Sequence, residues 1–120
     1  MDEVLFHKLI AHGMDVAGTL ARFGGNEALM MRFLRGFPND KTMSSLRDAM
    51  ISGDREAQKV AAHSLKGLSG NLGLTPVYES SSALMNALRA DDDADVSGLY
   101  ETLDQAYQTA VTMIAALPQA

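Results

Sequence analysis

The chain has 120 residues, of which 47% are hydrophobic and 21% are charged. This length and composition are typical of one globular domain and argue against global disorder. The absence of any run of about 20 apolar residues excludes a transmembrane helix, and the acidic start Met1-Asp2-Glu3 differs from the basic n-region of a secretory signal. The chain has no cysteine, which excludes disulfides, thiolate nucleophiles and Cys-ligated zinc and fits a reducing cytoplasm, where we expect the protein.

The charge is unevenly distributed along the chain. The net charge is −5, which argues against a nucleic-acid binder that relies on a basic surface. Residues 1–75 carry nine Lys/Arg and eight Asp/Glu, whereas residues 76–120 carry only Arg89 against seven acids. A site for an anion is therefore expected in the first two thirds of the chain.

The first 40 residues predict three short helices, because turn and capping residues separate the apolar segments. Residues 2–11 form the first helix, which Gly13 ends. Asp15 caps a second helix that stops at Gly24-Gly25, and Asn26 caps a third that reaches Phe37, with Phe33 among its apolar positions. Pro38 interrupts that third helix, since proline disfavours helical backbone at the residue before it.

The rest of the chain predicts four helices with one apolar face each. Asn39 or Asp40 starts one that ends at Gly53, and Asp54 caps the next, whose apolar stripe is Ala57, Ala61, Leu65, Leu68 and Leu72. Thr75-Pro76 reads as a cap followed by a first-turn proline, and after an acidic loop a final helix runs from about Asp95 to Pro118. The short connections predict an all-α antiparallel up-and-down four-helix bundle with short additional N-terminal helices, forming a single domain over residues 1–120.

The most informative residue is His63. At 100° per residue it lies about 200° from both Ala61 and Leu65, so it points away from the core stripe into solvent. Its own helix face carries two lysines and two glycines: Lys59, Lys66, Gly67 and Gly70. Because glycine disfavours a helix interior by about 1 kcal/mol relative to alanine, these glycines suggest that something approaches the backbone closely beside His63.

This pattern suits a phosphorylated histidine. An imidazole is a good nucleophile near neutral pH, and a phosphoryl group on it needs a nearby cation, which Lys66 supplies, and clearance for a partner, which Gly67 and Gly70 supply. The alternative from the residues alone is a surface histidine with two chance lysines and packing glycines.

The segment His63-Ser64-Leu65-Lys66-Gly67, followed by Ser69 and Leu72-Gly73, closely resembles the signature of histidine-containing phosphotransfer (HPt) domains. The resemblance covers residues 13–117 through weaker similarities at Gly13-Met14-Asp15, Gly24-Gly25, Phe33 to Phe37, Gly53-Asp54, Tyr78 to Ser82 and Leu84 to Leu88. Two departures are Pro38, which interrupts a helix that is often continuous in the family, and Leu68, where a smaller residue is common.

The resemblance implies a monomeric phosphocarrier in a two-component phosphorelay. His63 would accept a phosphoryl group from a receiver-domain aspartate, or from a histidine kinase, and pass it to a receiver domain of a response regulator. Lys66 would stabilise the phosphoryl charge, Lys59 is a further candidate for that role, and Val60, Gly67 and Gly70 would contact the partner. The resemblance implies no cofactor, metal, nucleotide site or kinase activity, and neither nucleic acid nor membrane as a partner; the chain also has no Walker motif.

Two other functions stay open. The chain could be the excised phosphotransfer domain of a larger hybrid or chemotaxis-type histidine kinase, although the start at Met1 and the end near Pro118 favour a free-standing protein. It could also be a non-catalytic helical adaptor in which His63 is incidental. His7 and His12 are interpreted as surface histidines, and Asp91–Asp95 as a solvated acidic turn, because it lacks the glycine and distal glutamate of an EF-hand loop.

Overall fold

The computed structural model describes residues 1–91 and 93–118. The described residues form seven α-helices and one 3-10 turn: α1 (Glu3–Ala11), α2 (Val16–Arg22), α3 (Glu27–Gly36), η1 (Phe37–Asn39), α4 (Thr42–Ser52), α5 (Arg55–Asn71), α6 (Thr75–Arg89) and α7 (Asp93–Ala115). Within this part of the chain there is no β-strand, only an isolated antiparallel bridge between Met14 and Leu74. The all-α prediction is confirmed.

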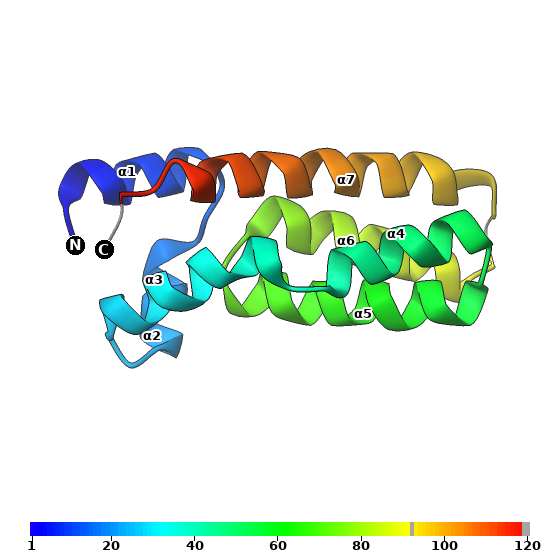
Figure 1. Cartoon of the computed structure of the whole chain (residues 1–120), viewed down its shortest axis with the longest axis horizontal. Coiled ribbons are helices and arrows are strands. Elements are labelled where there is room, and N and C mark those ends of the chain that lie inside the picture. The colour runs from blue at the N-terminus through cyan, green and yellow to red at the C-terminus, as the bar shows by residue number, and fades with distance from the viewer. Residues whose placement is uncertain (92, 119–120) are drawn as a thin grey trace.

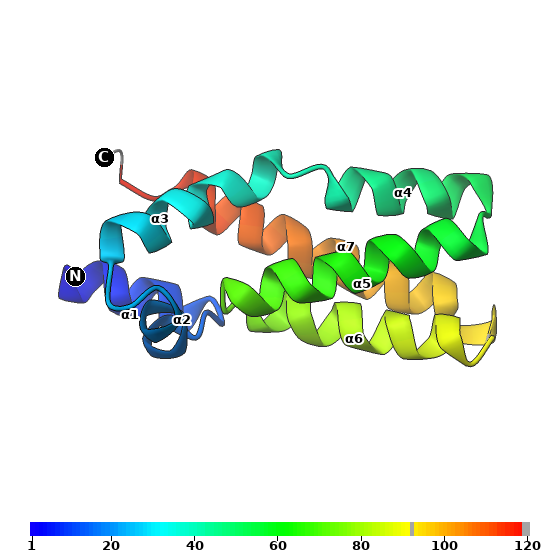
Figure 2. The same ribbon diagram turned by 90° about the horizontal axis from the view of Figure 1, so that it is seen from below.

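Helices α4 to α7 form an elongated antiparallel bundle, and the molecule as a whole measures 44 × 22 × 21 Å (Figure 1). Helix α5 packs against both α4 and α6, and α6 packs against α7, which runs along most of the molecule. Figure 2 shows α3 and α4 following one another along one edge of the bundle, with η1 between them. Pro38 lies in η1, so the predicted interruption is confirmed: the chain continues in the same direction after a local change of helix type.

Side-chain caps start most of the helices where the sequence predicts. The carboxylates of Asp15 and Asp54 accept the backbone N–H of Gly18 (3.0 Å) and of Ala57 (3.1 Å). The side-chain oxygen of Asn26 accepts the backbone N–H of Leu29 (3.0 Å). These bonds satisfy donors that the first turn of a helix leaves free, which fixes the boundaries of α2, α3 and α5 locally.

The start of α6 differs from the prediction. Thr75 is the first helical residue rather than the cap; Leu74 occupies the cap position and makes no side-chain bond there. The reason is tertiary, because Leu74 is buried in the core and its backbone pairs with Met14. Helix α7 likewise begins at Asp93, earlier than the predicted Asp95. In the predicted acidic turn Asp91 and Asp95 are exposed, whereas residue 92 lies outside the described residues.

The core runs along the inside of the bundle. Of the predicted stripe, Ala61 and Leu65 in α5 and Leu72 just after it are buried, whereas Ala57 and Leu68 are only partly buried. Methionine is prominent among the buried side chains, as expected for an unbranched residue that fills irregular gaps: Met14, Met30, Met31, Met43, Met85 and Met113.

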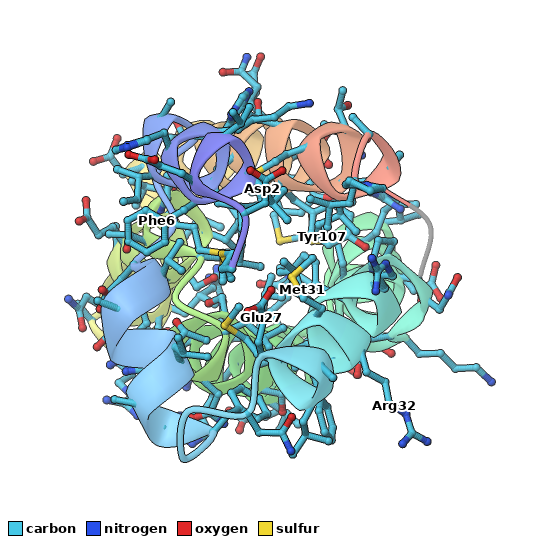
Figure 3. All side chains as sticks on the ribbon, turned by 90° about the vertical axis from the view of Figure 1, so that its left-hand side faces the viewer. Asp2, Phe6, Glu27, Met31, Arg32 and Tyr107 are labelled. Carbon is cyan, nitrogen blue, oxygen red and sulfur yellow. The ribbon has the colours of Figure 1, made fainter. Side chains whose placement is uncertain are left out.

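Helices α1 to α3 close one end of the bundle (Figure 3). There Met31 and Tyr107 point inward between the helices, and Arg32 points outward. The N-terminal ammonium of Met1 forms an ion pair with Glu27 (2.9 Å), which joins the start of α1 to α3. None of the described helices is long and apolar enough to cross a membrane.

Candidate functional site

His63 lies at the midpoint of α5 on its exposed face. Ala61, Ala62 and Leu65 are buried on the other side of the helix, so packing of the stripe into the core fixes the direction in which His63 points. Within the described part of the chain the imidazole makes neither a hydrogen bond nor an ion pair. Its ring is therefore open to a reaction partner from solvent.

The structure brings four of the predicted site residues together around one groove of about 540 Å³: His63, Lys66, Gly67 and Gly70. The wall opposite α5 comes from α2 and from the start of α6, including Arg22 and Tyr78. Lys59 and Val60 lie outside this lining. Val60 is exposed and borders a separate groove beside α4, together with Ser64.

The two lysines of the His63 face have different surroundings. The Lys59 ammonium lies 3.3 Å from the Glu56 carboxylate, so its charge is already balanced within the helix. The Lys66 ammonium has no acidic partner in the described part of the chain and lies 5.9 Å from the centre of the Tyr78 ring. Lys66 therefore brings an unbalanced positive charge to the groove, whereas Lys59 does not.

The two glycines also differ. A Cβ built on Gly67 would meet no atom within 4 Å, which leaves open space one turn after His63. A Cβ on Gly70 would lie 3.0 Å from Cδ1 and 3.2 Å from Cε1 of Tyr78. The clearance expected at Gly70 is thus filled by the protein's own Tyr78 ring rather than left open to a partner.

Arg22, which sequence reasoning missed, holds the C-terminal end of α5. Its guanidinium donates to the carbonyls of Gly70 (3.0 Å) and Asn71 (3.2 Å) and to the hydroxyl of Thr19 (3.0 Å). The last carbonyls of a helix lack partners within it, and a cation there is favoured by the helix dipole. No pattern in the sequence indicates this contact, because Arg22 lies about 50 residues from the carbonyls it binds.

A second, apolar groove of about 590 Å³ lies beside the first and shares Arg22 and Asn71 with it. Phe23, Phe37 and Leu68 line it, and Phe33, expected on the apolar face of its helix, is 54% exposed at its edge. The Phe33 ring packs on Phe23, with 5.5 Å between their centres.

The other histidines lie apart from this groove. Both are exposed on or just after α1: His7 lies 3.7 Å from Glu3, and the ring of His12 donates to the carbonyl of Lys8 (2.8 Å). The described residues contain no group of three His, Asp or Glu side chains that could hold a metal ion.

Comparison with known families adds to this geometry. The family model of the Hpt domain matches residues 38–116, which include all of α4, α5 and α6 and all but the first residue of the preceding 3-10 turn. No curated protein and no solved structure matched the chain. The similarity noted for residues 13–37 lies outside the matched range and stays a prediction. The chain therefore belongs to the Hpt domain family, whose members have a histidine phosphotransfer role in phosphorelays.

Proposed function

We propose that the chain is a phosphocarrier that accepts a phosphoryl group on His63 from a receiver-domain aspartate, or from a histidine kinase, and passes it to the receiver domain of a response regulator. The observation that supports this proposal best is the exposed His63 ring, without internal partners, in a groove with the unbalanced charge of Lys66. The partners are receiver domains of response regulators or of hybrid kinases, and the carrier acts as a monomer in the cytoplasm.

The proposed step is a direct displacement at phosphorus. The unprotonated ring nitrogen of His63 attacks the phosphorus of the aspartyl phosphate, and an N–P bond forms. The P–O bond to the aspartate breaks, and its electron pair leaves with the carboxylate. The imidazole keeps its proton on the other nitrogen, and the transfer to the next receiver is the reverse of this step.

Lys66 and Gly67 support this chemistry in different ways. The Lys66 ammonium balances the phosphoryl oxygens from the same groove, and charge-assisted contacts of this kind contribute about 1.5–3 kcal/mol. Gly67 leaves room for the receiver's aspartate to approach the ring. Val60 extends the partner-binding surface, and Lys59, whose charge is balanced by Glu56, assists less than Lys66. Gly70 belongs to this surface as part of the groove lining, although the Tyr78 ring fills the clearance expected there.

The test is transfer of label from a ³²P-phosphorylated receiver domain to the purified protein. We expect acid-labile, alkali-stable label on the wild type, none on His63→Gln, and wild-type labelling of the matched controls His7→Gln and His12→Gln. Label on the His63→Gln variant would refute the assignment. A folded wild type that takes no label from any receiver or kinase of its source organism would support the adaptor function instead.

A further inference from the structure

We propose that Tyr78 is a positioning residue, whose ring holds the Lys66 ammonium in the His63 groove; this inference rests on the proposed function. Tyr78 lies in the first turn of α6, and its side chain faces α5 across the groove. The residue is 39% exposed, so its ring is neither a core side chain nor free in solvent. It is the aromatic residue that lines the same groove as His63 and Lys66.

A glycine of α5 makes room for the Tyr78 ring. Gly70 lies one turn after Lys66, and the Tyr78 ring occupies the space where a Gly70 side chain would begin, 3.0 Å from the Cβ position. A side chain at residue 70 would require the ring to shift away from α5 by a few tenths of an ångström. The contact therefore explains why a glycine stands at this position near the end of α5.

The ring suits the task of holding a catalytic cation. The Lys66 ammonium lies 5.9 Å from the ring centre, at the outer limit of a cation–π contact, and its side chain is half-buried. A lysine side chain has large rotamer freedom, and part of that freedom must be lost when it binds a phosphoryl group. A carboxylate could also restrict Lys66 but would cancel its charge, as Glu56 does for Lys59. An aromatic face carries no net charge, so it restricts the ammonium and leaves the charge available.

The ring and not the hydroxyl carries this role. In the described part of the chain the Tyr78 hydroxyl makes no hydrogen bond, whereas the ring lies beside the Lys66 ammonium. Phenylalanine at residue 78 should therefore replace tyrosine, and leucine, which is apolar but has no π face, should not.

The first measurement is independent of phosphotransfer. We would record carbon–proton NMR spectra of the unphosphorylated wild type and of the variants Tyr78→Phe and Tyr78→Leu. The ring current should shift the Cε protons of Lys66 upfield in the wild type and in Tyr78→Phe, and they should return to the usual lysine position in Tyr78→Leu. Usual lysine shifts in the wild type would overturn the proposal even if His63 carries no phosphoryl group.

The second measurement is the rate of label transfer to His63, together with the phosphohistidine half-life. Tyr78→Phe should match the wild type, and Tyr78→Leu should slow transfer roughly two- to five-fold, the factor that corresponds to ~0.5–1 kcal/mol for an exposed cation–π contact. Unfolding midpoints of all variants check that the fold is kept. In a Lys66→Met background Tyr78→Leu should have no further effect, because the ring acts through Lys66.

Each other result counts against the proposal. A normal rate for Tyr78→Leu means that the ring does not matter, and a slow Tyr78→Phe means that the hydroxyl acts instead. An equal loss from Tyr78→Leu with and without Lys66 means that the ring contacts the receiver itself. A wild type without label on His63 refutes the proposed function, and the Lys66 NMR shifts then still decide whether Tyr78 holds the ammonium.

Discussion

Gly67 is a helical glycine that no contact among the described residues explains. It lies in the interior of α5, one turn after His63, and it is exposed. An added Cβ would meet no atom within 4 Å, so packing does not require glycine here, in contrast to Gly70. In the proposed relay, a receiver that approaches His63 would account for the absence of a side chain at this position.

We expect Gly67→Ala to stabilise the protein by up to about 1 kcal/mol, because alanine is the better helix former. Gly67→Gln should also keep the fold, yet slow transfer from a receiver by obstructing the approach to the imidazole. Chemical denaturation and the transfer rate are measured on the same samples. Gly98 in α7 is the matched control, since its Cβ position is also open, and Gly98→Gln should transfer normally. Normal transfer by Gly67→Gln would contradict the clearance role.

Among single residues, the exposure of His63 could be predicted and the contacts of Tyr78 could not. The apolar stripe of one helix fixes which face is buried, so the direction of His63 follows from local periodicity. The contact between Tyr78 and Gly70 depends on the register of α6 against α5. A glycine within a helix indicates that another side chain packs closely against the backbone, but the sequence does not show which helix supplies that side chain.

The turn between α5 and α6 is held by the start of α2. The backbone N–H of Asp15 donates to the carbonyl of Gly73 (2.8 Å), and the Thr19 hydroxyl donates to the carbonyl of Asp15 (2.6 Å). Thr19 is fully buried in this contact. Together with Arg22, these bonds fix the end of α5, which lines the His63 groove.

Gly73→Ala should destabilise the protein for two reasons. Its backbone has φ +66°, which strains a residue with a side chain by about 1–3 kcal/mol. A Cβ there would also lie 2.7 Å from the carbonyl oxygen of Asp15 and closer still to the Thr19 hydroxyl. Gly53→Ala is the control, because it has φ +74° and open space, so it suffers the strain alone. Equal losses of unfolding free energy in the two variants would contradict the prediction, because they would show that α2 moves away from the added Cβ without any loss of stability.

Among the helices, local capping signals predict most of the boundaries, and tertiary contacts shift the others. Asp15, Asn26 and Asp54 cap their helices as predicted, because a cap bond spans only two or three residues. Thr75 does not act as a cap, because the pairing of Leu74 with Met14 brings in a segment 60 residues away. The packing of Phe33 also depends on a tertiary contact, because its neighbour Phe23 comes from the segment after α2.

For the whole molecule, the contact of α7 with η1 couples stability to alkaline pH. The Tyr107 ring packs against Phe37, with 5.4 Å between the ring centres, and the residue is buried. Burial raises the pKa of the Tyr107 phenol, and the Asp40 carboxylate adds to this while Arg47 opposes it. The folded state therefore favours the neutral phenol.

We expect the free energy of unfolding to fall as the pH rises above about 10, where the phenol ionises in the unfolded chain but not yet in the folded one. The stabilisation that the neutral Tyr107 phenol gives to the folded state is fully present below that pH. It is lost as the pH rises through the higher pKa of the folded state. Chemical denaturation of the wild type and of Tyr107→Phe at pH 7 and at alkaline pH tests this. The variant should lose less stability than the wild type between the two pH values; parallel losses would contradict the prediction.

The arrangement of the bundle itself followed from short connections and one apolar face per helix. The packing of α1 to α3 on one end of the bundle could not be predicted, because their apolar faces do not indicate which part of the bundle they cover. The ion pair of Met1 with Glu27 and the bonds of Arg22 are likewise products of that packing.

The position of His63 on one side of a rod only about 22 Å wide has a kinetic consequence. In the proposed relay, donor and acceptor receivers must both reach the same imidazole and therefore exclude one another. Transfer then follows a double-displacement order, in which the first receiver departs before the second one binds. An excess of unphosphorylated acceptor competes with the loaded donor and slows the loading of the carrier.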